Sequence, residues 1–250
     1  MIRERDRVQT LRLETLEQRE LMAGNVWVGV ENGLLRVVGD HLGNEVSITP
    51  TRNAGEFTVR GNSGTRVNGL LGQTFSGVSL GIQVHLGDGN DKVNVSRGSS
   101  SHRDVIPGPL GLGIDGGDGN DTIVVENVRV EHSCGISAGA GNDRVEVKGS
   151  YFGWDLIVDT SYGNDDVSIK NGTTAAHYLM IGTGDGDDSI DVNRAGAAWV
   201  YVVAGAGRDR LSVRYLHSAL PPGFDLGAGV DPHPTFGTNY YPFHYLIGVN

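Results

Sequence analysis

Apolar and polar residues alternate on both sides of a short glycine-rich phrase that recurs along most of the chain. Residues 82–84 and 92–95 flank one copy with this alternation, and residues 134–136 and 144–148 flank another. A period of two residues is typical of β-strands with one buried face. The pattern therefore predicts an all-β protein built from short strands joined by tight turns.

The glycine-rich phrase returns at nearly constant intervals. Its aspartates are Asp91, Asp121, Asp143, Asp165, Asp188, Asp209 and, weakly, Asp231. The first interval is 30 residues and the later ones are 21 to 23 residues. A fixed period of this size is the signature of a solenoid in which each repeat forms one coil. We therefore expect residues 25–231 to form a right-handed single-stranded parallel β-helix of about nine coils, with about 22 residues in each coil.

The register of these coils follows from fixed distances to the aspartates. Apolar residues at constant offsets, such as Leu112, Cys134 and Leu156, should stack into internal aliphatic ladders. Gly43-Asn44-Glu45 fits the same phrase 46 residues before Asp91, or two periods, which predicts a degenerate coil near residues 64–68. Insertions such as residues 96–111 should leave the coil as loops. The proline- and aromatic-rich residues 232–250 should cap the last coil.

The first 24 residues differ from the rest of the chain because they contain five arginines, and no glycine before Gly24. Their composition predicts a short N-terminal helix or a disordered segment. Residues 11–24, LRLETLEQRELMAG, resemble the signature that opens many secreted surface proteins of planctomycete bacteria. The resemblance implies export, so we expect the protein to be extracellular or at the cell surface.

Composition and charge exclude several classes of protein. Lys and Arg number 20 against 30 Asp and Glu, and the resulting net charge of -10 repels nucleic acid. No run approaches the ~20 apolar residues that a transmembrane helix needs. One cysteine excludes an internal disulfide, and 39 glycines with only 8 prolines indicate a folded chain with many turns.

The aspartates of the repeated phrase are the candidate site residues. Stacked coils would place them ~4.8 Å apart, where their charges repel. Backbone N–H groups of the same turn are one way to offset this repulsion, and a calcium ion shared between adjacent turns is another. The candidate calcium ligands are Asp88, Asp91, Asp118, Asp121, Asp143, Asp165, Asp188 and Asp209. The asparagines that precede the aspartates are expected in the turns because asparagine tolerates a left-handed backbone.

One copy of the phrase, Gly116-Gly117-Asp118-Gly119-Asn120-Asp121-Thr122-Ile123, resembles the nonapeptide of the RTX (repeat in toxin) family. That resemblance implies turns that bind calcium between consecutive coils, with Asp121 and its equivalents as ligands. RTX nonapeptides follow one another in tandem, whereas this chain has one phrase in each coil. A coil of this length is closer to a three-sided β-helix, so only one corner would carry ions.

Catalytic candidates are few. His102, Arg103 and Asp104 lie together in the inserted loop, and His132, Trp154 and His177 share one offset, which predicts that their rings stack. We therefore expect a structural or adhesive module whose partners are cell-surface or matrix components, including polysaccharide. The alternative is a polysaccharide-active enzyme, a lyase or hydrolase, on the same fold.

Overall fold

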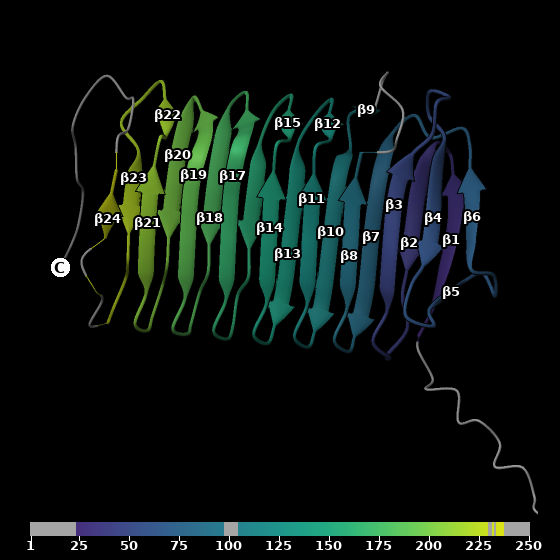
Figure 1. The fold of residues 1–250 in the computed structure, drawn as a ribbon, viewed down its shortest axis with the longest axis horizontal. Helices are drawn as coiled ribbons and strands as arrows, with labels where there is room; N and C mark the ends of the chain where they lie inside the picture. The colour runs from purple at the N-terminus through teal and green to yellow at the C-terminus, as the bar shows by residue number, and fades with distance from the viewer. Residues whose placement is uncertain (1–23, 98–104, 230–231, 233, 238–250) are drawn as a thin grey trace, which may run out of the picture.

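A computed structural model describes residues 24–97, 105–229, 232 and 234–237 of the chain (Figure 1). The described residues form strands and turns and contain no helix, which confirms the all-β prediction. The N-terminal helix and the export signature expected before Gly24, and the loop residues His102, Arg103 and Asp104, lie outside the described residues. The boundaries at residues 24 and 231 stay predictions.

Two long sheets run side by side along the molecule (Figure 1). The ten-stranded sheet contains, in spatial order, β23 (Gly223–Asp225), β20 (Trp199–Val203), β18 (Tyr178–Gly182), β16 (Leu156–Asp159), β13 (Cys134–Ala140), β10 (Gly111–Asp118), β7 (Gly81–Asp88), β2 (Leu34–Val38), β1 (Asn25–Glu31) and β5 (Arg66–Val67). From β23 to β2 every pairing is parallel, so the chain returns to this sheet once in each coil.

The second sheet has 14 strands. Its main path is β24 (Thr235–Phe236), β21 (Arg210–Arg214), β19 (Ser189–Ala197), β17 (Asp166–Ala175), β14 (Arg144–Lys148), β11 (Thr122–Glu126), β8 (Lys92–Ser96), β3 (Glu45–Pro50), β4 (Phe57–Gly61) and β6 (Gly72–Phe75). A short third row contains β9 (Val105–Ile106), β12 (Arg129–Val130), β15 (Tyr151–Phe152) and β22 (His217–Ser218), together with the ends of β17 and β19. Each coil thus has two long sides and one short side.

The expected count of nine coils was wrong, since the parallel solenoid has about six turns. Its N-terminal part is antiparallel: β1 pairs with β2, β3 with β4, and β4 with β6. Strand β3 pairs directly with β8, with Glu45 opposite Lys92. The 46 residues between Glu45 and Asp91 therefore span one step of the stack, and no coil lies between β3 and β8. Residues 66–67 of the predicted degenerate coil instead form β5, which pairs in parallel with β1 at the end of the ten-stranded sheet.

The internal ladders are confirmed. Leu112, Cys134, Leu156, Leu179 and Val200 are register partners on consecutive strands of the ten-stranded sheet. All five are at most 1% exposed. Like side chains from successive coils therefore form one continuous core, and burial raises the pKa of the Cys134 thiol well above its usual range.

At the C-terminal end, Thr235 and Phe236 form β24, which adds one more parallel strand to the second sheet. The Phe236 ring lies 5.5 Å from the ring of Phe224 and packs against the core. The cap expected over residues 232–250 stays a prediction. Residues 238–250 lie outside the described part of the chain.

Candidate functional site

The glycine-rich turns bring the repeated aspartates into one column. Gly117 and Gly119 have φ values of 107° and 138°, a left-handed region that disfavours residues with a side chain. A Cβ atom at either position would also collide with the carbonyl oxygen of Gly87 or Gly89 in the preceding coil. Glycine is therefore required at this corner both by backbone conformation and by the close approach of stacked turns.

The aspartate column is held by hydrogen bonds between coils. The backbone N–H of each member donates to the Oδ1 atom of the next member, over 2.6 to 2.9 Å. In order, the column contains Asn44, Asp91, Asp121, Asp143, Asp165, Asp188 and Asp209. The donors thus come from the preceding coil, and the expectation that they belong to the same turn was wrong.

A second, exposed column runs beside the first in the opposite direction. The N–H of Asn120 donates to Oδ1 of Asn90, and the same bond links Asn142 to Asn120 and Asn164 to Asn142. None of these asparagines has a positive φ, so the explanation by left-handed turn geometry was wrong. Their side chains instead bind one coil to the next, which complements the aspartate column.

The column aspartates are at most 2% exposed. The second oxygen, Oδ2, has no hydrogen-bond partner among the described residues in Asp91, Asp121, Asp143 and Asp188. Burial raises the pKa of Asp91, Asp121 and Asp143 to about 6, mainly because the charged form loses water. Neighbouring carboxylates raise these pKa values further. The column aspartates therefore take up protons at a higher pH than an exposed aspartate does.

The column meets the requirements of a calcium site only in part. The Oδ2 atoms without partners are hard oxygens, but every Oδ1 atom accepts an N–H, and calcium takes six to eight oxygen ligands. Within the described residues, no three His, Cys, Asp or Glu side chains converge on one point. The additional acids Asp88 and Asp118 are register partners of each other, exposed at the surface. The residues do not form a complete calcium site, and calcium binding stays a prediction.

An exposed row of rings crosses the coils next to the ten-stranded sheet. The rings of His132 and Trp154 are stacked with centroids 5.6 Å apart, and those of Trp154 and His177 lie 3.9 Å apart. Tyr178 and Trp199 continue the row, stacked at 6.0 Å. The predicted contact of the first three rings is confirmed, with His132 and Trp154 stacked and His177 tilted by 42° against Trp154. Trp154 is 44% exposed and Trp199 is 39% exposed, so large ring surfaces face solvent.

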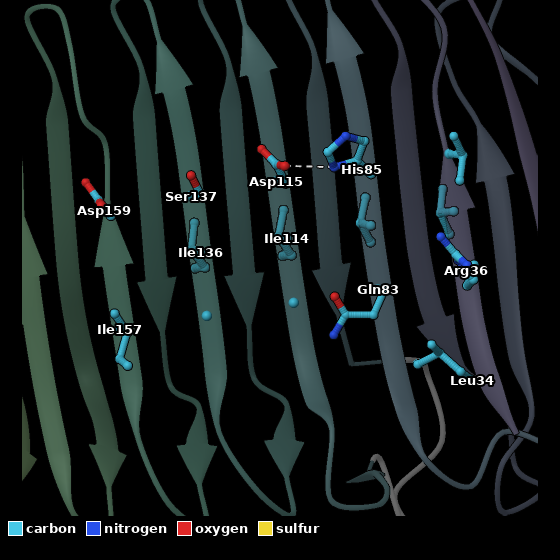
Figure 2. A pocket seen from close by; sticks show the side chains of 15 residues that line it. Leu34, Arg36, Gln83, His85, Ile114, Asp115, Ile136, Ser137, Ile157 and Asp159 are labelled. Carbon is cyan, nitrogen blue, oxygen red and sulfur yellow. Dashed lines mark ion pairs between the residues drawn. The ribbon is translucent and has the colours of Figure 1, made fainter.

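A groove of about 690 Å³ lies on the outer face of the same sheet, across β2, β7, β10, β13 and β16 (Figure 2). Gly113 and Gly135 are register partners on β10 and β13 and contribute no side chains of their own to its floor. Gln83 and Ile157 occupy the same register on either side of this glycine pair. The hollow therefore exists because two adjacent coils have glycine where their neighbours have side chains.

Polar side chains form one margin of the groove, and sequence analysis did not single them out. His85 Nδ1 lies 2.7 Å from Asp115 Oδ2, and Ser137 and Asp159 follow in the same register (Figure 2). All four residues lie six positions before a column aspartate. The constant offset that identified the inward ladders would therefore also have identified this outward row.

The outer face of the second sheet is different, because charged residues and ion pairs dominate it. Lys148 Nζ lies 3.2 Å from Glu126, and Lys170 Nζ lies 2.6 Å from Glu146. Arg144 pairs with Asp166 on the neighbouring strand. Ion-paired surfaces of this kind are typical of a solvated face, whereas exposed rings beside a groove are typical of a binding face. The ten-stranded sheet therefore carries the candidate site.

No protein family, curated protein or solved structure matches the chain. Along residues 24–97 and 105–229 and the few residues described beyond them, no helix is long and apolar enough to cross a membrane. The structure thus places the protein in the class of parallel β-solenoids. Its function has to be inferred from the outer face of the ten-stranded sheet.

Proposed function

We propose that this protein is a secreted or cell-surface structural and adhesive module that binds polysaccharide on the outer face of its ten-stranded sheet. The observation that carries the proposal is the row of contacting rings from His132 to Trp199, in which Trp154 and Trp199 are exposed. Flat apolar rings with polar edges suit the faces of sugar rings, and a solenoid repeats such contacts from one coil to the next. The export-type sequence at residues 11–24 supports a place outside the cell.

The length of the solenoid also supports an adhesive role, because the same outward positions recur in every coil. Each coil adds a ring or an outward side chain in the same register, so several weak contacts can act on one chain-like ligand. The net charge of -10 favours a neutral polysaccharide over an anionic one. A neutral glycan of the matrix or cell surface is therefore the proposed partner.

Removing the rings tests this proposal. The double variant Trp154→Ala and Trp199→Ala should bind neutral polysaccharide about tenfold more weakly, since each ring contributes ~0.5–1.5 kcal/mol and tenfold corresponds to ~1.4 kcal/mol. Binding is measured by pull-down on insoluble cellulose, xylan, mannan and starch and by calorimetry with soluble hexasaccharides. Pectate and alginate serve as anionic comparisons.

The matched control for ring removal is Tyr162→Ala, because Tyr162 is exposed outside the row and its register neighbours, Ala140 and Asp185, carry no ring. This control should bind like the wild type. Equal binding by the double variant, or no binding of any polysaccharide by the wild type, would overturn the proposal. New reducing or unsaturated sugar ends in the same mixtures would favour the polysaccharide-active enzyme, with the His85–Asp115 pair beside the groove as its candidate group.

Calcium binding at the turns is a separate hypothesis with its own test. It predicts that millimolar calcium at pH 7.5 raises the melting temperature, because a ligand bound only by the folded state stabilises that state. Asp121→Asn should remove most of this gain, because Asp121 contacts coils on both sides and its turn carries a second acid, Asp118. Asp209→Asn should remove little, because the turn of Asp209 has Ala206 in place of that acid. If calcium does not change the melting temperature, the calcium hypothesis is refuted and the column has only a structural role. If the two substitutions have equal effects, Asp121 is not a stronger calcium ligand than Asp209.

A further inference from the structure

The groove on β2, β7, β10, β13 and β16 differs from the ring row in having an open floor. A Cβ atom built on Gly135 would have no other atom within 4 Å, apart from its chain neighbours. Gly113, one coil earlier, is covered by the side chain of Gln83, and Gly223 is covered by the ring of Tyr201. Gly135 therefore leaves an uncovered stretch of sheet surface in the middle of the hollow.

The direction of the groove limits what it can hold. It crosses five strands, a span of ~19 Å at ~4.8 Å for each strand spacing. The three inner strands, β7, β10 and β13, are paired on both sides, so they offer no free edge to which a peptide could add as a further strand. An occupant must therefore lie on the outer face along the axis of the solenoid, without pairing with a strand.

The polar groups at the groove suit hydroxyl groups. Gln83 offers an amide beside the floor, and Asp115, Ser137 and Asp159 offer oxygens along one margin (Figure 2). Arg36 is the cation at one end and pairs with Glu31 at 3.5 Å. Asp115 and Asp159 disfavour an anionic ligand, while carboxylates and amides are good partners for sugar hydroxyls.

We propose that this groove is a binding site for an extended neutral glycan, with one sugar ring lying on the open sheet surface at Gly135. The inference rests on the proposed function, since it assigns a second contact region for the same kind of ligand. In an extended β-1,4-linked glucan, successive sugars are spaced much like the coils of this solenoid. Each sugar can therefore meet the equivalent position of the next coil, from Gln83 through Gly135 to Ile157.

Filling the floor tests the groove without disturbing the fold. Gly135→Gln adds a side chain where the structure has open space, and Gly135 has no positive φ that would make the change strained. Binding of cellohexaose, measured by calorimetry, should weaken at least tenfold, and the melting temperature should stay the same. Maltohexaose, whose α-linked chain curves away from this spacing, should bind the wild type at least tenfold more weakly than cellohexaose.

The matched control is Gly182→Gln, on the same outer face but outside the groove. A Cβ atom at Gly182 comes only within 4.0 Å of Asp159 Oδ1. This variant should bind cellohexaose like the wild type. If Gly135→Gln binds as tightly as the wild type while the ring variant binds weakly, the groove is refuted and the proposed function stands.

Failure of the wild type to bind any polysaccharide would overturn the proposed function and, with it, the groove proposal. Groove-dependent binding of an extended uncharged hexapeptide in place of the glycan would overturn the groove proposal alone. A drop in the melting temperature of Gly135→Gln would show that the floor is not open, which also contradicts the inference.

Discussion

Val158→Asp should unfold the central part of the solenoid. Val158 is fully buried, between its register partners Ile136 and Ile181 in neighbouring coils. An uncompensated buried charge costs about 3–5 kcal/mol, a large share of the 5–15 kcal/mol that stabilises a typical domain. Coils contact only their neighbours, so the damage separates the N-terminal half of the stack from the C-terminal half. Urea denaturation followed by circular dichroism measures the loss.

The neighbouring substitution Ile157→Asp is the matched control. Ile157 lies one residue earlier on β16 and is 41% exposed on the outer face. A charge there remains in water, so the free energy of unfolding should change by no more than about 0.5 kcal/mol. If Val158→Asp were as stable as Ile157→Asp, the inward and outward faces of β16 would be assigned the wrong way round.

The inward ladders were predictable because two simple regularities coincide. Strand residues alternate between faces, and each ladder residue has a constant distance in sequence from a turn aspartate. Val158 and Ile136 each lie seven residues before a column aspartate, so their stacking follows from counting alone. The corner glycines were predictable for the same reason, since the repeat fixes their place in each coil.

The N-terminal part was mispredicted because its length imitates the repeat. Glu45 precedes Asp91 by 46 residues, which equals two coils, yet these residues include the antiparallel strands β4 and β6. Alternation of apolar residues indicates strands but does not distinguish parallel from antiparallel pairing. The direct pairing of Val46 with Val93 is a tertiary contact that no local pattern encodes.

The groove was not predicted because none of its residues, taken alone, differs from common residues elsewhere in the chain. Gly113 and Gly135 resemble the many turn glycines of the chain, and His85 and Asp115 are separated by 30 residues. Only the parallel register places them on adjacent strands of one face. The ring row was predictable in part, because His132, Trp154 and His177 share one offset, whereas Trp199 is displaced by one residue.

Lowering the pH from 7.5 to 5 should make the protein more stable. Asp91, Asp121 and Asp143 have pKa values raised from 3.8 to about 6, chiefly because burial penalises the charged carboxylate. A raised pKa means that the folded state binds protons more tightly than the unfolded state. The resulting stability is complete below pH 3.8 and is lost as the pH rises through about 6.

The size of the effect follows from linkage. Raising one carboxyl pKa from 3.8 to about 6 corresponds to ~3 kcal/mol below pH 3.8, of which ~1.4 kcal/mol is present at pH 5. Neighbouring carboxyls titrate as a coupled set rather than independently. A gain of ~1.4 kcal/mol between pH 7.5 and 5 raises the melting temperature by roughly 3–6 °C for a chain of this size. Glu146 acts in the opposite sense, since hydrogen bonding to Lys170 lowers its pKa and its contribution is lost in stronger acid. The maximum of stability is therefore expected below pH 5, where the column is protonated and Glu146 is still ionised.

Asp143→Asn tests whether the column causes this pH dependence. Asn44 already occupies the first position of the column, buried and donating its N–H to Asp91, so an amide fits this environment. The amide oxygen can still accept the N–H of Asp121, but the side chain no longer titrates. The rise in melting temperature between pH 7.5 and 5 should therefore be smaller in this variant than in the wild type. Asp159→Asn, which changes an exposed acid, should keep the full rise, and a wild type that loses stability steadily over this range would refute the protonated column.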